Sequence, residues 1–258
     1  MLKPLLRVGL KNLNKNILVK IFIGVFALVC SVSIFAYAKD KLTVVTEDWP
    51  PYNYLSAEGE VVGKSTEIIK KTLQAANIEY TLNIYPWARA YKMALEQPNV
   101  LIYTTFKIKE RAKLFQWVCP LDSINHSIDI FKLANRDDIS VDKFSDLKKY
   151  KLGVSRAVFM HQMLKENGFV EGTNYYITRY NLVNIRLLLQ GRVDVIFGNK
   201  ESINILLKKL NVATSSLLSI YKLAQHEMSQ TCMAFSLKTP KALVEKVRAS
   251  HQKLYLNN

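Results

Sequence analysis

The chain has 258 residues, of which 49% are hydrophobic and 22% charged, a composition typical of a globular protein that excludes a disordered chain. This length suits one or two domains with a sizeable core. The formal net charge is +15, but lysine and arginine are scattered without an arginine-rich block or basic helix, so the charge indicates no nucleic-acid partner.

Residues 1–38 have the pattern of a secretory signal peptide. Their charged side chains are all basic: Lys3, Arg7, Lys11, Lys15 and Lys20. An apolar run follows at residues 21–35, and Ala36-Tyr37-Ala38 fits an A-x-A cleavage site. We therefore expect a cleavable signal and a periplasmic protein. An uncleaved anchor is the alternative, because the 18 uncharged residues from 21 to 38 reach the lower limit for a membrane-spanning helix.

Two cysteines, Cys119 and Cys232, follow the predicted cleavage site. An exported compartment permits a disulfide, but two cysteines do not make a disulfide framework. We expect two buried free thiols, with a disulfide as the alternative.

Predicted strands and helices alternate along the rest of the chain. Strands are expected at residues 42–46, 80–85, 100–103, 115–118, 128–133, 152–154, 175–178, 193–197, 219–223 and 232–236. Helices are expected at residues 63–77, from Pro86 onward, at 158–167, from a cap at Asn181 to Gly191, at 203–210 and after Thr239-Pro240. This alternation indicates an α/β fold with largely parallel sheets. The charged, turn-rich residues 135–142 are the candidate passage between two lobes.

The first predicted strand ends in a stiff turn within residues 42–54. Two consecutive prolines follow the strand, and proline cannot donate to a sheet ladder. Glu47, Asp48, Trp49 and Tyr52 thus lie at the carboxyl end of a strand, which is where ligands bind in open α/β sheets. The alternative is a packed turn whose aromatic pair covers the core.

Motifs of the common catalytic sites are missing from the sequence. It contains neither G-x-x-x-x-G-K-[ST] nor G-x-S-x-G. The four histidines lie far apart without metal-ligand spacing, and Cys119 has no evident base beside it. We therefore expect a binding protein rather than an enzyme, with no cofactor and no metal.

An ordered set of five features resembles the extracellular solute-binding proteins of family 3, periplasmic proteins similar to those for polar amino acids. These are the signal peptide, LTVVTEDWPPYNY at residues 42–54, GKSTEII at 63–69, KERAKLFQW at 109–117, and the pair formed by Asp146-Leu-(x)4-Leu-Gly-Val and LQGRVDVI at 189–196. The segment YPWARAY at residues 85–91 further resembles a subgroup of orphan members.

This resemblance implies an α/β, two-lobed type II periplasmic-binding-protein fold. Two crossovers join the lobes, and a ligand closes them by a hinge motion. Lobe 1 would comprise residues 40–130 and 222–258, and lobe 2 would comprise residues 131–221.

Binding residues follow from the resemblance where the motif matches. Arg111 matches the family arginine for an α-carboxylate, which a planar guanidinium grips with two parallel hydrogen bonds; a surface salt bridge is the alternative. Thr104 and Thr105 end the preceding strand and could donate hydroxyl groups. By spacing, however, the family's ligand-binding threonine falls on Phe106 and its amine-binding aspartate on Asn199. Loss of that carboxylate argues against an ordinary α-amino acid as ligand.

Further candidate ligand-binding residues are Asp48, Trp49, Tyr52, Trp87, Arg89, Ser155 and Arg156. Ser155 and Arg156 follow the strand at residues 152–154, where family members place contacts from lobe 2. Arg156 together with Arg111 would make a cationic cleft that favours an anionic solute. Arg89 lies off the apolar helix face, so solvent exposure is its equal alternative.

The expected function is capture of a small polar, carboxylated, amino-acid-like solute by a monomeric periplasmic protein that delivers it to an ABC-type transporter. The alternative is a ligand sensor that acts in trans on a membrane signalling partner. An enzyme similar to cyclohexadienyl dehydratase is less favoured, because the sequence offers no convincing acid–base pair.

Overall fold

The computed structural model describes residues 41–122, 127–223 and 230–256, so the predicted signal segment lies outside the described residues. Residues 41–258 form one compact unit, separate from residues 1–40. No helix among the described residues is long and apolar enough to cross a membrane.

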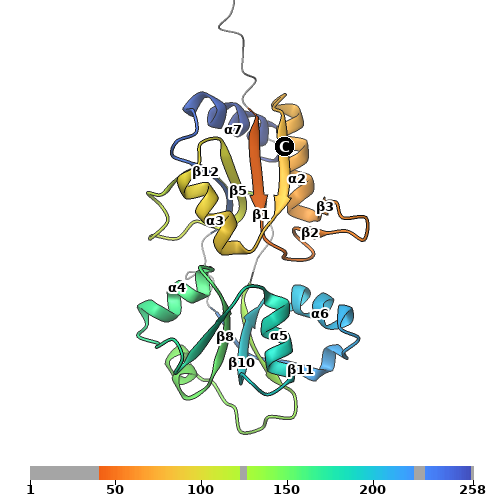
Figure 1. The fold of residues 1–258 in the computed structure, drawn as a ribbon, viewed down its shortest axis with the longest axis vertical. Helices are drawn as coiled ribbons and strands as arrows, with labels where there is room; N and C mark the ends of the chain where they lie inside the picture. The colour runs from red at the N-terminus through yellow and green to blue at the C-terminus, as the bar shows by residue number, and fades with distance from the viewer. Residues whose placement is uncertain (1–40, 123–126, 224–229, 257–258) are drawn as a thin grey trace, which may run out of the picture. The chain divides into compact units, whose positions relative to one another are not determined.

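The first sheet has the strand order β4-β1-β5-β12-β6 (Figure 1). Its strands are β1 (Leu42–Thr46), β4 (Tyr80–Ile84), β5 (Val100–Phe106), β6 (Phe115–Val118) and β12 (Thr231–Ser236). The flanking helices are α2 (Lys64–Ala75), α3 (Trp87–Glu96) and α7 (Lys241–Tyr255). Strand β1 runs parallel to β4 and β5, whereas β12 is antiparallel to β5 and β6.

Alternation along the strands divides the first sheet's apolar residues between its two faces. Leu42 and Val44 of β1 pack in the cluster that includes α2 and α7 residues such as Leu73 and Val247. Val45 packs in the cluster that contains apolar residues of α3. Both faces are therefore covered, as expected for a parallel sheet with helices on each side.

The second sheet has the strand order β11-β7-β10-β8-β9. Its strands are β7 (Asp129–Leu133), β8 (Leu152–Ser155), β9 (Tyr175–Thr178), β10 (Val195–Gly198) and β11 (Leu217–Lys222). The associated helices are α4 (Phe159–Glu166), α5 (Asn181–Leu189) and α6 (Lys200–Lys209), with short 3-10 turns η1 (Phe144–Lys149) and η2 (Thr214–Ser216). A small separate sheet pairs β2 (Tyr54–Leu55) with β3 (Val61–Val62).

The chain passes between the two sheets twice, from β6 to β7 and from β11 to β12. The expectation that residues 135–142 form the passage is wrong, because these residues follow β7, which already belongs to the second sheet. A charged, turn-rich stretch can equally be a surface loop within one lobe. Asp129 and Lys222 lie in this sheet, just outside the expected limits of lobe 2.

Cys119 and Cys232 form a disulfide, so the expectation of two free thiols is wrong. Cys119 directly follows β6, and Cys232 lies in β12, the antiparallel neighbour of β6. Strand pairing therefore brings the two Cα atoms to 4.7 Å, although 113 residues separate them in the chain. The sequence alone could not supply this pairing, because it depends on where the chain returns from the second sheet.

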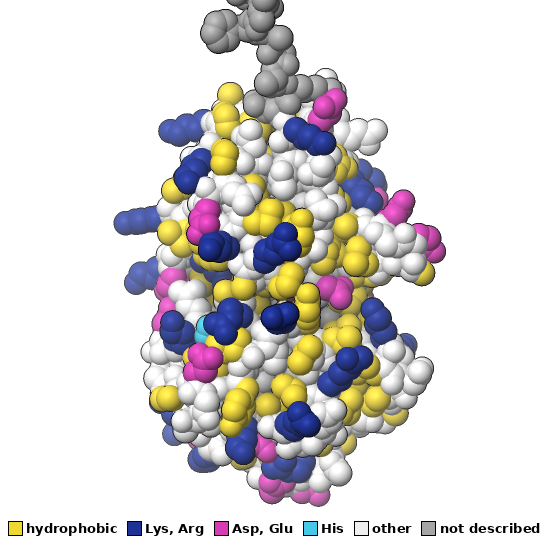
Figure 2. Space-filling view, in the orientation of Figure 1, with side chains coloured by type: hydrophobic (Ala, Val, Ile, Leu, Met, Phe, Trp, Pro, Cys, Tyr) yellow, Lys and Arg dark blue, Asp and Glu magenta, His cyan; other side chains and the backbone are white. Residues whose placement is uncertain are grey.

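Charged side chains are mixed on the visible surface. On the face shown in Figure 2, lysine and arginine side chains are spread over the molecule with acidic side chains among them. This distribution matches the absence of a basic block in the sequence.

Candidate functional site

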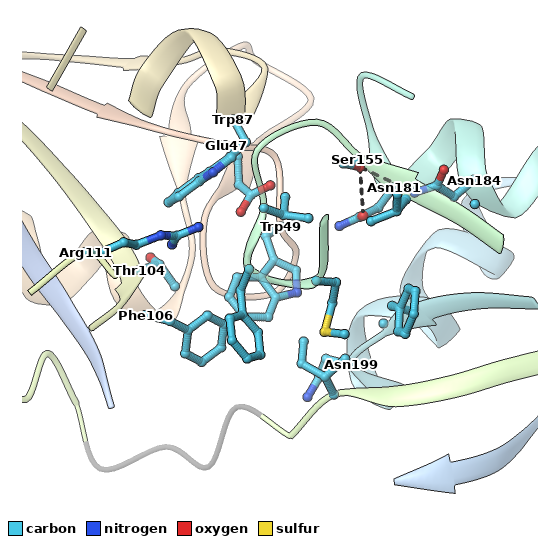
Figure 3. A pocket seen from close by; sticks show the side chains of 18 residues that line it. Glu47, Trp49, Trp87, Thr104, Phe106, Arg111, Ser155, Asn181, Asn184 and Asn199 are labelled. Carbon is cyan, nitrogen blue, oxygen red and sulfur yellow. Dashed lines mark hydrogen bonds between the residues drawn. The ribbon is translucent and has the colours of Figure 1, made fainter. Parts of the chain in front are cut away.

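A cavity of about 70 Å³ lies where strand ends of both sheets converge. The loop after β1, the start of α3, and the end of β5 with the loop that follows it supply one side, and residues of β8, α4, α5 and the β10–α6 junction supply the other. The lining residues include Glu47, Trp49, Trp87, Thr104, Phe106, Arg111, Val154, Ser155, Phe159, Met160, Asn181, Asn184, Phe197 and Asn199 (Figure 3). Such strand ends are the usual ligand position in α/β folds.

Asn53 ties together the ends of the first two central strands. Its Nδ2 donates to the Glu47 carbonyl oxygen at 2.7 Å, and its Oδ1 accepts from Thr104 Oγ1 at 2.7 Å. Thr104, at the end of β5, adopts a positive φ of 57°. The Thr104 hydroxyl, expected to donate to a ligand, therefore donates to Asn53 instead, although the side chain lines the cavity.

Arg111 is 2% exposed and reaches the cavity from the loop after β5. Its guanidinium carbon lies 5.5 Å from the ring centre of Trp87 and 5.0 Å from that of Tyr91, within cation–π range. Its Nη2 donates to the Ala157 carbonyl oxygen at 3.1 Å, while its Nε has no partner among the described residues. Burial lowers the Arg111 pKa, and the negative charge of Glu47 raises it in part.

Glu47 lines the cavity but is not among the ligand-binding residues predicted from the sequence. Its side chain lines the cavity, and Figure 3 shows its carboxyl group and the Arg111 guanidinium directed into the same space. Within the described residues, its carboxyl group has no hydrogen bond or ion pair. Burial raises the Glu47 pKa to about 8, an effect that Arg111 opposes and Asp48 reinforces. The sequence feature that could have pointed to Glu47 is its position at a strand end, beside Asp48.

Side chains of β8, β9 and α5 make a hydrogen-bonded network at the opposite wall. The Ser155 hydroxyl donates to Asn181 Oδ1 at 3.3 Å and accepts from Asn184 Nδ2 at 3.4 Å. Asn184 Oδ1 in turn accepts from Thr178 Oγ1 at 2.7 Å. The expectation that Asn181 caps its helix is wrong, since the N-cap residue of α5 is Tyr180 and the Asn181 side chain bonds Ser155.

Asn199, which the sequence resemblance aligns with an amine-binding aspartate, lines the cavity and caps α6. Its Oδ1 accepts from the backbone N–H groups of Glu201 and Ser202, at 3.0 and 3.2 Å. Its Nδ2 donates to the Ser127 carbonyl oxygen at 3.1 Å. The side-chain oxygen is therefore engaged by the helix terminus.

Contacts between the two sides of the cavity converge on Ala157, which has a φ of 61°. Its carbonyl oxygen accepts from Trp87 Nε1 at 2.7 Å as well as from Arg111. A further ion pair joins Lys64 of α2 to Glu201 of α6 at 2.9 Å. These contacts link the two sides of the cavity.

The structure brings six of the predicted site residues to the cavity wall: Trp49, Trp87, Thr104, Arg111, Ser155 and Asn199. It places the other five, Asp48, Tyr52, Arg89, Thr105 and Arg156, outside that lining. The side chains of Arg89 and Arg156 are exposed, so the cationic pair expected from Arg156 and Arg111 is not formed at this cavity. Tyr52 packs against Trp49 with ring centres 4.9 Å apart, and Thr105 is fully buried.

No group of three or more histidine, cysteine, aspartate or glutamate side chains could hold a metal ion in the part of the chain that the structure describes.

Comparison with known proteins supports the fold. No family model matches the chain, and no curated protein matches it in sequence. A histidine kinase sensor domain with similarity to periplasmic binding proteins superposes with a TM-score of 0.70 at 18% identity, covering 83% of this chain and 90% of that chain. An ancestral arginine-binding protein bound to arginine gives 0.68 at 16% identity, with 83% and 92% covered.

A third similar structure is an arginine-, lysine- and histidine-binding protein from Geobacillus stearothermophilus, with a TM-score of 0.67 and 20% identity. The superposition covers 89% of that protein and 83% of this chain. At these identities the likeness defines the fold: this chain has the two-lobed α/β fold of periplasmic binding proteins. The predicted fold class is thereby confirmed.

Proposed function

We propose that this chain is a solute-binding protein that encloses a small carboxylated solute between its two lobes, with Arg111 as the carboxylate anchor. The observation that carries the proposal is a buried guanidinium at a cavity, with one nitrogen unpartnered among the described residues. A ligand carboxylate that bonds Nε and a terminal nitrogen would satisfy that donor with charge-assisted hydrogen bonds.

Closure of the cavity around the solute would use the Ala157 contacts. Trp87 and Arg111 come from the first-sheet side and donate to a carbonyl oxygen that precedes α4 of the second-sheet side. A hinge motion at the two chain passages would break and re-form these bonds as the solute enters and leaves. We propose lobe 1 at residues 40–130 and 222–258 and lobe 2 at residues 131–221, linked by those passages, except that Asp129, Ile130 and Lys222 lie in strands of the second sheet and so belong to lobe 2.

The protein would act in the periplasm after removal of residues 1–38 and deliver its solute to an ABC-type transporter. A second candidate function is ligand sensing for a membrane signalling partner. The similarity to the sensor domain of a histidine kinase favours this alternative. Isotope-labelled solute uptake separates the two functions: loss of the protein should abolish uptake in the first case and leave it unchanged in the second.

Replacement of Arg111 tests the proposed binding function. For the unmodified protein, a carboxylated solute at about 100 times its Kd should stabilise the native state by about 2.7 kcal/mol, or about 5–10 °C in the unfolding midpoint. Arg111→Ala should abolish this shift, because the anchor for the carboxylate is gone. Differential scanning fluorimetry against a panel of small carboxylates measures the shift.

The matched control is Arg89→Ala, which removes an exposed arginine from α3 outside the cavity. This variant should retain the ligand-induced shift. Each variant's midpoint without ligand reports whether the change has damaged the fold. Carboxylate binding that survives Arg111→Ala in a folded protein would contradict the anchor role.

A further inference from the structure

The cavity has its ionisable groups on one side. Glu47 follows β1 and Arg111 follows β5, so both come from the first sheet, and their side chains are directed into the same space (Figure 3). The facing wall contributes apolar side chains, among them Val154, Met160 and Phe197, and neutral polar side chains such as Ser155 and Asn181, which bond each other. A ligand that spans the cavity would thus have its charged end at Arg111 and an uncharged end at the facing wall.

Apart from Glu47 and Arg111, the polar side chains of the described lining are neutral, so they offer an ammonium group no opposite charge. Asn199 Oδ1 accepts two backbone N–H groups at the start of α6, and Asn181 Oδ1 accepts from the Ser155 hydroxyl. Within the described lining, Glu47 is therefore the group that could pair with an ammonium, and it could do so only when ionised.

Glu47 itself is in the right place to act as a donor. Its carboxyl group lies in a largely apolar site without a hydrogen-bonding partner among the described residues, which favours the neutral acid over the carboxylate. Burial raises the Glu47 pKa to about 8, and the charged groups that act on it are Arg111 and Asp48. A neutral carboxylic acid can donate one O–H hydrogen bond, whereas ionised glutamate has no donor.

We propose that the cavity takes a small monocarboxylate whose remainder is apolar and carries no ammonium group, and that protonated Glu47 and Arg111 together bind its carboxylate. This inference rests on the proposed function and deepens it. The small cavity, about 70 Å³, limits the apolar remainder to a few carbon atoms in the enclosed state. Deaminated analogues of small amino acids belong to this class.

Matched pairs of probes test the proposal. Propanoate and 3-methylbutanoate are compared with alanine and valine, which differ from them by one ammonium group. Isothermal titration calorimetry on the purified protein should show binding of the deaminated acids in preference to the amino acids. Above pH about 8, affinity for the acids should fall about tenfold per unit, because deprotonated Glu47 cannot donate and repels the ligand.

Replacement of Glu47 gives the second arm. Glu47→Gln supplies an amide N–H donor that does not titrate, so the decline above pH about 8 should disappear. Glu47→Ala removes the donor and should weaken acid binding by about 10- to 100-fold. Unfolding midpoints without ligand show whether either variant has lost its fold.

Each other outcome has a definite meaning. Amino acids that bind as tightly as their deaminated partners would overturn this inference and leave the carboxylate-binding function standing. A decline above pH 8 that persists in Glu47→Gln would remove Glu47 from the site. If no carboxylate probe binds the folded protein, the proposed function falls and this inference falls with it.

Discussion

At the scale of single residues, the Asn199 side chain serves the backbone of α6. Asn199 stands at the position that the sequence resemblance assigns to an amine-binding aspartate, but its side-chain oxygen is neutral and accepts the first free N–H groups of α6. Arg111 meanwhile lines the cavity, and its Nε has no partner within the described residues. The two observations together favour an anion over a zwitterion.

Truncation of Asn199 tests whether its side chain serves mainly as the cap of α6. Asn199→Ala should lower the free energy of unfolding by about 1 kcal/mol, or the midpoint by about 2–4 °C, because α6 loses its cap. Asn199→Asp is the matched control, since aspartate caps a helix about as well as asparagine. Chemical denaturation measures both. A truncation without any cost in stability would show that the cap is not the main role of this side chain.

The candidate site was only partly predictable from sequence at this scale. The motif match predicts Arg111, Trp87 is a further candidate on the second predicted helix, and both line the cavity. Glu47 was passed over in favour of its neighbour Asp48, yet Glu47 lines the cavity and Asp48 does not. Neighbouring residues at a strand end point in different directions, and the turn that follows decides which of them meets the ligand.

At the scale of elements, the segment between β8 and α4 controls the contact across the cavity. Ala157 has a positive φ, and its carbonyl oxygen accepts from both Trp87 and Arg111. Its N–H donates at 3.0 Å to Nδ1 of His161, which lies in the first turn of α4. The imidazole therefore supports the backbone group on which the contact depends, and it can do so only in the neutral form.

Acid should weaken this contact. Burial lowers the His161 pKa, assisted by the charges of Lys165 and Arg156 and opposed by Glu171. A lowered native pKa means that the stabilisation is fully present above the ordinary value of about 6.5 and is lost as pH falls below it. Unfolding midpoints should therefore decline from pH about 7 to about 5, and His161→Ala should decline less.

The informative quantity is the difference between the two proteins, because burial also lowers the pKa of His251 and that histidine contributes in both. His161→Ala should begin with a lower midpoint at neutral pH, since Ala157 N–H loses its acceptor. Superimposable pH profiles in the two proteins would mean that His161 does not support the Ala157 segment.

At the scale of the whole molecule, periodicity predicts the elements far better than it predicts their connections. The alternating strands and amphipathic helices of both sheets were predictable, because burial on two faces leaves a pattern in the sequence. Neither the true passages between the sheets nor the bond between Cys119 and Cys232 leaves such a pattern. Both follow from the insertion of β12 between β5 and β6, a contact between distant parts of the chain.

The disulfide fixes the place of β12 covalently, because it joins β12 to the end of β6. The two cysteines are 113 residues apart in the chain, and the whole second sheet lies between them. A bond across so long a loop restricts the unfolded chain strongly. The variant Cys119→Ser/Cys232→Ser should therefore lose roughly 2–4 kcal/mol of stability. Its unfolding midpoint should fall by about 5–15 °C with unchanged circular dichroism, because strand pairing between β6 and β12 does not require the bond.

Reduction provides the control for this comparison. A strong reductant should lower the midpoint of the unmodified protein towards that of the double variant and leave the double variant unaffected. Mass spectrometry before and after thiol alkylation reports whether the bond is formed. The unmodified protein with its disulfide intact could unfold at the same temperature as the double variant. That result would show that strand pairing alone, without the cross-link, holds β12 in the first sheet.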